Sequence, residues 1–264
     1  MTRARVMSRS RGAVEARVAL VTGASRNIGS AIAHRFAEDG IRVVLVSRDR
    51  AAVQAVAERI GSSGGTALPL PGDVTDPNQV RAIVTEATET FGRVDILVNN
   101  AVTRRHMPLE QTTLEDWHAV LAVTLTGTFN CVQAVLPTMR AHRWGRIINL
   151  GGVAGQLGAR NRIAVVTAKS GLFGMTRALA LETAPDGVTA NVVSPGIIAT
   201  DRGDLNKLGD ARAASDHYER EIEATPVGRP GRSEEVAATC AFLASEDAAF
   251  VTGQVLGVNG GRHM

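Results

Sequence analysis

The chain has 264 residues, of which 44% are hydrophobic, and a formal net charge of +3. This length suffices for one domain with a sizeable core, because single α/β domains commonly reach it. Residues 1–17 contain five arginines and one glutamate, so the rest of the chain is near neutral and we expect no nucleic-acid partner.

The beginning of the chain differs in composition from the rest. Residues 1–15 are predicted to form a disordered basic tail, and residues 16–264 a single domain. An arginine-rich start could be a transit peptide, but it lacks the apolar run of a signal sequence, and a strand pattern begins within Val14–Val21. No stretch approaches the ~20 apolar residues that cross a membrane. We therefore expect a cytoplasmic protein with no membrane partner.

Seven short apolar runs alternate with longer amphipathic segments. The runs are Val18–Val21, Val43–Val46, Ala67–Leu70, Ile96–Val98, Ile147–Leu150, Val188–Val193 and Val255–Val258. The segments with helical periodicity include Asp49–Ile60, Pro77–Phe91 and Leu114–Arg140, and Asp76 before Pro77 is a helix-start pattern. This alternation predicts a single-domain α/β fold with a doubly wound, seven-stranded parallel sheet of the Rossmann type.

The stretch from Ala199 to Gly231 fits neither pattern. Its residues are small, polar and charged, and Pro226 and Pro230 lie at its end. Such a composition predicts a mobile insertion over a site.

A glycine turn follows the first strand. The order is Thr22-Gly23-Ala24-Ser25-Arg26-Asn27-Ile28-Gly29, and a helix is expected to begin near Ser30. Strand, turn and helix N-terminus together make an anion site, because unpaired backbone N–H groups and the helix dipole point at a pyrophosphate. A second strand follows about twenty residues on, so the turn predicts dinucleotide binding.

At these residues the chain resembles the short-chain dehydrogenase/reductase family, from about Arg17 to Gly261. The turn matches the family's TGxxxGxG, Asp73-Val74 its adenine-contacting pair, and Asn99-Asn100-Ala101 its NNAG strand end, while Ser194–Thr200 resembles the segment that holds the nicotinamide carboxamide. Asn27 replaces the middle glycine of this motif. Asparagine adopts the left-handed backbone conformation more readily than most residues, so the replacement is compatible with the turn. Val102 replaces the glycine after Ala101.

The resemblance implies a set of cofactor contacts and a choice of nucleotide. The implied contacts are Gly23, Ser25, Arg26, Asn27, Ile28, Gly29, Arg48, Asp73, Val74, Asn100, Lys169, Pro195, Gly196, Ile198 and Thr200. The second strand ends in Ser47-Arg48, where NAD-preferring relatives have an acidic residue. Arg48 and Arg26 suit a 2′-phosphate, so we expect NADP(H) rather than NAD(H).

The same resemblance shows that this chain differs from other family members at the catalytic positions. Family members use a serine, a tyrosine and a lysine four residues after the tyrosine. Lys169 aligns with that lysine, but the tyrosine position is Val165, the serine position is Gly152, and the position of an assisting asparagine is Thr124. We therefore expect an atypical member that lacks the catalytic tyrosine and serine.

A missing general acid typically costs a factor of about 10² to 10⁴ in rate, so another donor would be needed for ketone reduction. The only tyrosine is Tyr218. The other candidates are His217, His106, Thr124, Arg162 and an ordered water near Lys169, each of which also has a structural interpretation. Gly151, Gly152 and Val165 are expected to line the substrate pocket. Arg104 and Arg105, which follow the fourth strand, would suit an anionic small-molecule substrate.

Three functions remain open. The first is an NADP(H)-dependent oxidoreductase that reduces an activated C=C, an iminium or a carbonyl. The second is a cyclase, dehydratase or isomerase that uses the same crevice without redox chemistry, and the third is a non-catalytic NADP(H)-binding protein.

The resemblance also implies a homotetramer assembled through the helices near Leu114–Arg140 and Ile163–Thr183. Cys131 and Cys240 have no neighbouring His or Cys, so we expect buried thiols and no metal.

Overall fold

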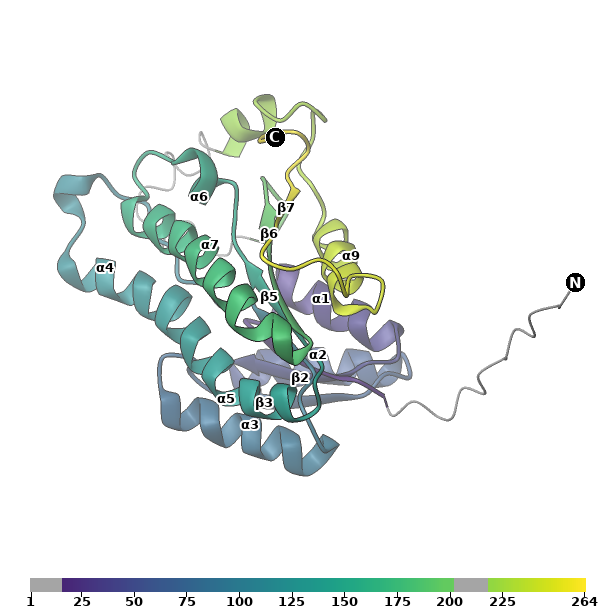
Figure 1. Cartoon of the computed structure of the whole chain (residues 1–264). Coiled ribbons are helices and arrows are strands. Elements are labelled where there is room, and N and C mark those ends of the chain that lie inside the picture. Colours follow the sequence, from purple (N-terminus) through teal and green to yellow (C-terminus); the bar gives the residue numbers. More distant parts are fainter. Residues whose placement is uncertain (1–15, 202–217) are drawn as a thin grey trace, which may run out of the picture.

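The computed structural model describes residues 16–201 and 218–264. In these residues all strands join one seven-stranded parallel sheet of order β3-β2-β1-β4-β5-β6-β7, which confirms the predicted fold (Figure 1). The strands are β1 Val18–Thr22, β2 Arg42–Ser47, β3 Ala67–Pro71, β4 Ile96–Asn99, β5 Gly145–Leu150, β6 Val188–Pro195 and β7 Val255–Val258. Each coincides with a predicted apolar run to within a few residues.

Helices cover both faces of the sheet, because successive strand side chains point to opposite faces. Ala19 and Val21 pack into one core with α1 (Asn27–Glu38), α2 (Arg50–Ser62) and α9 (Ser233–Ala244). Val18 and Leu20 pack into the other core with α3 (Pro77–Phe91), α5 (Gly127–Ala141) and α7 (Ile163–Thr183). The shorter elements are η1 (Leu109–Gln111), α4 (Leu114–Leu121), η2 (Ala122–Thr126), α6 (Ala154–Leu157) and η3 (Ala184–Asp186).

Side-chain caps explain where two of the helices begin. Asp76 accepts hydrogen bonds from Asn78 N at 2.8 Å and Gln79 N at 3.3 Å, and Pro77 occupies the first helical position, as predicted. Hydrogen bonds from Gln79 and the Asn78 amide lower the pKa of Asp76. Asp49 caps α2 through Ala52 N. The helix after the glycine turn begins at Asn27, three residues before the predicted start.

The predicted helix Leu114–Arg140 is one helical run with an interruption. Between α4 and α5, the five residues of η2 are π-helical, a geometry common near functional sites. The whole run Leu114–Ala141 is long and apolar enough to cross a membrane. This finding corrects the expectation that no stretch of the chain would be long and apolar enough. A core helix of a soluble protein meets the same criterion, and α5 packs against α3 and against strands β4 and β5.

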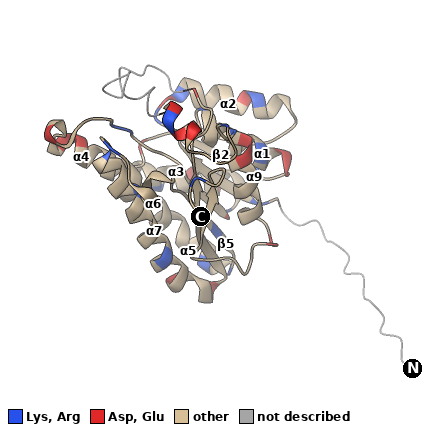
Figure 2. Cartoon of the chain, turned by 90° about the horizontal axis from the view of Figure 1, so that it is seen from above, with Lys and Arg blue, Asp and Glu red and all other residues tan. Residues whose placement is uncertain are grey.

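Arg17, the second residue of the predicted domain, has a half-buried side chain that pairs with Asp95. One further prediction needs correction. The stretch Ala199–Gly231 is not irregular throughout, since residues 218–223 are helical and Ile198 forms a bridge with Gly231. The predicted tail at residues 1–15, and residues 202–217 of the predicted insertion, lie outside the described residues. On the described helices, charges of both signs are interspersed (Figure 2).

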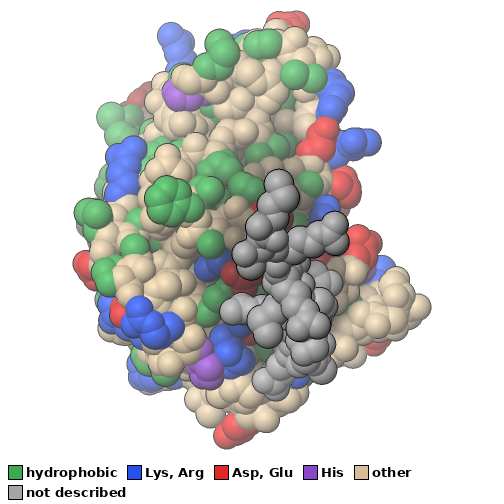
Figure 3. Space-filling view, turned by 45° about the vertical axis from the view of Figure 1, so that its right-hand side comes forward, with side chains coloured by type: hydrophobic (Ala, Val, Ile, Leu, Met, Phe, Trp, Pro, Cys, Tyr) green, Lys and Arg blue, Asp and Glu red, His purple; other side chains and the backbone are tan. Residues whose placement is uncertain are grey.

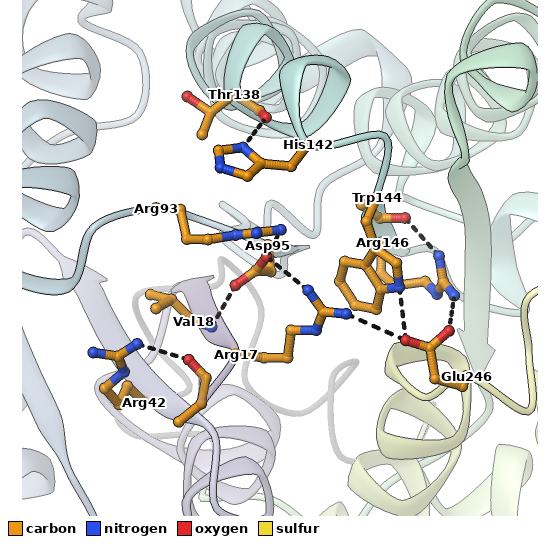
Figure 4. Close-up of polar contacts among 12 residues, drawn as sticks. Arg17, Val18, Arg42, Arg93, Asp95, Thr138, His142, Trp144, Arg146 and Glu246 are labelled. Carbon is orange, nitrogen blue, oxygen red and sulfur yellow. Dashed lines mark hydrogen bonds and ion pairs between the residues drawn. The ribbon is translucent and has the colours of Figure 1, made fainter. Parts of the chain in front are cut away.

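A polar cluster joins strands β1, β4 and β5 to the end of α9 at the amino edge of the sheet (Figure 4). Asp95 is 1% exposed, accepts a hydrogen bond from Val18 N at 2.9 Å and pairs with Arg17 and Arg93. Trp144 lies between the guanidinium groups of Arg17 and Arg146, at 3.8 Å and 4.3 Å from its ring centroid. Glu246 contacts all three of these side chains. The cluster therefore fixes the edge of the sheet opposite the carboxyl ends of the strands.

We predict that Asp95→Asn destabilises the fold by about 1.5–3 kcal/mol, because it removes the buried carboxylate that pairs with the half-buried Arg17 and Arg93. Denaturant unfolding followed by circular dichroism measures the change. Asp39→Asn is the matched control: it breaks the exposed Arg35–Asp39 pair, which is worth at most about 0.5 kcal/mol. Equal effects of the two substitutions would contradict a stabilising role for the cluster.

Candidate active site

A crevice opens at the carboxyl ends of the strands, where the chain order in the sheet reverses between β1 and β4. Doubly wound sheets bind ligands at this switch point. The crevice is lined by Gly23, Ser25, Arg26, Asn27, Ile28, Gly29, Val46, Ser47, Arg48, Gly72, Asp73, Val74, Asn100, Ala101, Val102, Thr103, Arg104, Val123, Thr200 and Asp201. The structure thus brings most of the predicted cofactor residues together.

The shape of the glycine turn depends on Asn100. Its side-chain amide donates to Thr22 O at 3.1 Å and to Gly23 O at 3.0 Å, while Thr22 Oγ1 accepts from the amides of Asn100 and Ala101. A Cβ at Gly29 would lie 2.2 Å from Gly23 O and 2.6 Å from Asn100 Nδ2. Only glycine at position 29 therefore lets the turn, α1 and the end of β4 approach so closely.

The N-terminus of α1 fits an anionic group. Its N-cap residue Arg26 is extended and makes no side-chain capping bond, so the first backbone N–H groups are not satisfied by a side-chain cap and suit phosphate oxygens. Asn27, which replaces the family's middle glycine, has φ of +52°. Its amide group exchanges two hydrogen bonds with the backbone of Asp201, at 2.7 Å and 3.0 Å. Asn27 thus also connects the turn to the segment after β6.

Arg48 lies at the far end of the crevice. Its side chain is 72% exposed and forms a long 3.9 Å contact with Asp73. Such an exposed contact is weak, so the guanidinium can reorient toward a ligand phosphate. Asp73 Oδ1 accepts hydrogen bonds from the amide and hydroxyl of Thr75, which holds its side chain at the rim.

A second cavity adjoins the crevice. Both are lined by Ile28, Asn100, Val102, Arg104 and Thr200, so a ligand in one reaches the other. The remaining lining residues are His106, Leu150, Gly151, Gly152, Val153, Ala154, Leu157, Gly158, Ala159, Arg162, Val165, Lys169, Pro195, Gly196, Ile197, Ile198, Glu221 and Arg262. Its walls therefore combine apolar side chains with several basic ones.

Helix α7 supplies one wall of this cavity. Arg162, Val165 and Lys169 lie at positions i, i+3 and i+7, on one face of the helix. Lys169 Nζ donates to Leu150 O at the end of β5. Burial, and then the Arg104 guanidinium, lower the pKa of Lys169 from 10.5 to about 7. Val165 is buried and also packs with Val120 and Ala168 between α4 and α7, so its size matters to packing as well.

His106 and Arg162 meet on another part of the wall. Arg162 Nε donates to His106 Nδ1 at 3.1 Å, and Met107 N donates to Asn161 O at 2.9 Å. Two segments that are 56 residues apart are thereby held together, one after β4 and the other at the N-terminus of α7.

Other predicted residues lie elsewhere. Arg105 does not line either cavity, because its Nε donates to Asp116 at 2.9 Å. Thr124 is 2% exposed in η2, and its hydroxyl has no hydrogen-bond partner among the described residues. Tyr218 lines neither cavity, and His217 lies outside the described residues.

No sequence motif indicated several of the residues that line the second cavity. Arg262 pairs with Glu221 at 3.1 Å, and this pair closes one side of the second cavity. The two residues are 41 positions apart and belong to no motif, so only the folding of the C-terminal segment over β6 brings them to the site.

The cysteines lie away from the site. Cys131 and Cys240 are buried, reduced thiols, as predicted, and burial raises the pKa of Cys131 to about 12. In residues 16–201 and 218–264, no group of three or more His, Cys, Asp or Glu side chains could hold a metal ion.

Comparison with known proteins agrees with the geometry. The family model described as "Enoyl-(Acyl carrier protein) reductase" matches residues 23–263. The chain is 41% identical to a 3-oxoacyl-[acyl-carrier-protein] reductase of Vibrio cholerae over 252 residues, covering 95% of this chain and 99% of the relative. The reductases of that name from Escherichia coli K12 and Synechocystis are each 40% identical, covering 95% and 96% of this chain and 98% and 99% of the relatives. The chain belongs to the short-chain dehydrogenase/reductase family. It is therefore an oxidoreductase of this family's type.

Within this family fold, the contact of Gly29 with Gly23 allows a sharp test. We predict that Gly29→Ala weakens NADPH binding at least about tenfold, because the new Cβ forces apart the turn whose N–H groups face the phosphates. Calorimetric titration measures the affinity. Gly174→Ala in α7 is the matched control, because its Cβ meets nothing within 4 Å. Undiminished NADPH affinity in Gly29→Ala would contradict the assignment of the turn.

The lowered pKa of Lys169 makes stability depend on pH. Between pH of about 7 and 10.5 the unfolded chain binds the Lys169 proton and the folded chain does not, so the free energy of unfolding rises with pH across this window. We predict that Lys169→Met removes this rise and is most stabilising, relative to the wild type, below pH of about 7.

Denaturant unfolding of both proteins from pH 6 to about 10.5 measures the difference. Arg160→Met, which removes an exposed cation outside both cavities, is the control and should leave the pH dependence unchanged. Parallel curves for Lys169→Met and the wild type would show that the pKa of Lys169 is not lowered in the folded protein.

Proposed function

We propose that this chain is an NADP(H)-dependent reductase of a small molecule, acting on a carbonyl, an iminium or an activated C=C, with carbonyl compounds as the first choice. The observation that carries the proposal is the junction of the two cavities. The nucleotide crevice opens, at residues such as Asn100 and Thr200, into a pocket that contains Lys169. A reduced nicotinamide at that junction supplies the hydride.

The chain's own residues fit the nucleotide along its length. The uncapped start of α1 suits the pyrophosphate, and Asp73 with Val74 suits the adenine end. Lys169 suits the nicotinamide ribose, and Pro195, Gly196, Ile198 and Thr200 suit the carboxamide by family resemblance. Arg48, exposed and only loosely paired, favours NADP(H) over NAD(H).

The catalytic positions support an atypical active site. By family resemblance, the tyrosine and serine positions are Val165 and Gly152, and both line the pocket. Neither has a proton to donate. We infer that the proton that completes a carbonyl reduction comes from another group, whereas an alkene or iminium acceptor would need less help from an acid.

The names of the relatives suggest the substrate class. Several are reductases of 3-oxoacyl groups on acyl carrier protein, which are ketones on a thioester chain. The basic side chains Arg104 and Arg162 on the pocket wall favour a substrate that also carries negative charge. We propose a 3-oxoacyl thioester as the first substrate to test.

The experiment is a screen for NADPH oxidation, followed at the NADPH absorbance band. The substrates are a short 3-oxoacyl thioester, an enone and a cyclic imine, and NADPH and NADH affinities are measured by calorimetry on the same sample. Reduction of the thioester supports the proposal, and reduction of only the enone or imine would narrow it to acid-independent acceptors. Tight NADPH binding without any oxidation would favour a non-catalytic binder.

We also propose a cytoplasmic homotetramer. Phe129 on α5 and Leu181 on α7 are 53% and 82% exposed, which agrees with subunit contacts through these helices. Figure 3 shows exposed hydrophobic side chains on one face of the molecule. Light scattering measures the assembly mass.

The choice of nucleotide can be tested at Arg48. We predict that Arg48→Ala raises the NADPH Kd about 10- to 100-fold, the usual effect of losing a charge-assisted hydrogen bond, and leaves the NADH Kd nearly unchanged. Arg50→Ala is the matched control, since Arg50 is exposed and lies outside the crevice. An equal loss of affinity for both nucleotides would show that Arg48 does not read the 2′-phosphate.

A further inference from the structure

Among the described residues that line the second cavity there is no tyrosine, and His106 is the one histidine. His106 follows β4, is 9% exposed and lines the second cavity together with Val165 and Lys169. Its Nδ1 accepts a hydrogen bond from Arg162 Nε at 3.1 Å. The guanidinium Nε always carries its proton, so Nδ1 must offer its lone pair and the single imidazole proton must sit on Nε2.

Arg162 affects more than the position of that proton. A cation beside an ionisable group favours its more negative form, so the Arg162 guanidinium stabilises the imidazolate that forms when Nε2 gives up its proton. The ring is thereby prepared to act as a neutral hydrogen-bond donor and acid, a role that neutral imidazole fills in other enzymes.

His217 lies outside the described residues, and each of the other predicted side-chain donors has an obstacle. Tyr218 does not line the cavity, and Thr124 is buried outside it. Arg162 lines the cavity, but a guanidinium does not release its proton in proteins. Lys169 is engaged with Leu150 O, and the proposed function places it against the nicotinamide ribose.

We propose that His106 is the catalytic acid of this chain and that Arg162 is its positioning residue. The inference rests on the proposed carbonyl reduction. Hydride from the reduced nicotinamide adds to the carbonyl carbon while the C=O π electrons move to oxygen. The oxygen takes the proton from His106 Nε2, and the imidazolate then takes a proton from solvent. The nicotinamide is oxidised, and the carbonyl is reduced to an alcohol.

The fold supports this placement. The Met107 N to Asn161 O hydrogen bond fixes the backbone beside both side chains. Arg162 is the N-cap residue of α7 and lies on the same helix face as Val165 and Lys169. His106 is therefore held across the pocket wall from α7, by a cation that belongs to the helix that bears the family's lysine.

The first test is nitrogen NMR of histidine-labelled full-length protein, with the His106 signal assigned by its loss in His106→Gln. We expect a neutral ring at pH 7 with the proton on Nε2. In Arg162→Met the preference for this tautomer should be lost, and Arg162→Lys, which keeps a donor and a charge, should restore part of it. A proton on Nδ1, or an imidazolium at pH 7, would overturn the proposal.

The second test is kinetic, with NADPH and a short 3-oxoacyl thioester. We expect His106→Phe to lower kcat by a factor of about 10² to 10⁴ and to leave the NADPH Kd within about twofold, since His106 is not among the residues proposed to hold the nucleotide. Arg162→Met should lower kcat more than it changes KM, with partial rescue in Arg162→Lys. His118→Gln, an exposed histidine on α4 outside both cavities, should match the wild type.

The outcomes separate the two proposals. If the wild type oxidises NADPH with the thioester and His106→Phe is equally fast, the role of His106 is wrong and the proposed function stands. If the wild type binds NADPH but reduces no carbonyl compound, carbonyl reduction fails and the acid role fails with it. Unchanged NADPH affinity in His106→Phe also shows that a slow variant is folded.

Discussion

The site depends first on the hydrogen bonds between Asn100 and the end of β1. The Asn100 amide binds the carbonyl oxygens of Thr22 and Gly23, and the Thr22 hydroxyl binds the amides of Asn100 and Ala101. These bonds join neighbouring strands where the sheet order reverses, and they set the path of the glycine turn. The position of α1, and with it the set of N–H groups that suits a pyrophosphate, follows from this junction.

The electrostatic properties of the second cavity depend on the free-energy cost of burying charged side chains. Lys169, Arg104, Arg162 and His106 share walls with apolar side chains, and in such surroundings charged groups interact more strongly than in water. The effect is visible in the lowered pKa of Lys169, which burial and Arg104 produce together. It also makes the contact of Arg162 with His106 chemically important, because the Arg162 guanidinium determines which nitrogen of the imidazole ring carries the proton. A pocket without a phenol can thus still contain an acid.

The sequence predicted the fold in detail because local and global preferences agree. Each apolar run became a strand, and Asp76 with Pro77 placed the start of α3 at the predicted residue. The prediction was weaker where tertiary contacts override the local sequence pattern. The π-helical turn within Leu114–Ala141 left no mark in the periodicity, and no local pattern indicated that Arg17 binds Asp95 across 78 positions. In the same way Arg105 looked like a pocket residue, but a neighbouring aspartate holds it elsewhere.

What the sequence by itself determined is the sheet, the glycine turn and the identity of the side chains at the family's catalytic positions, because these depend on residue type and short spacing. Only the tertiary structure decided which distant groups meet in the pocket. The contact of Arg162 with His106 and the pair Arg262–Glu221 each join segments more than 40 positions apart. No local pattern encodes such contacts, since they arise from how the loops after parallel strands converge at one edge of the sheet.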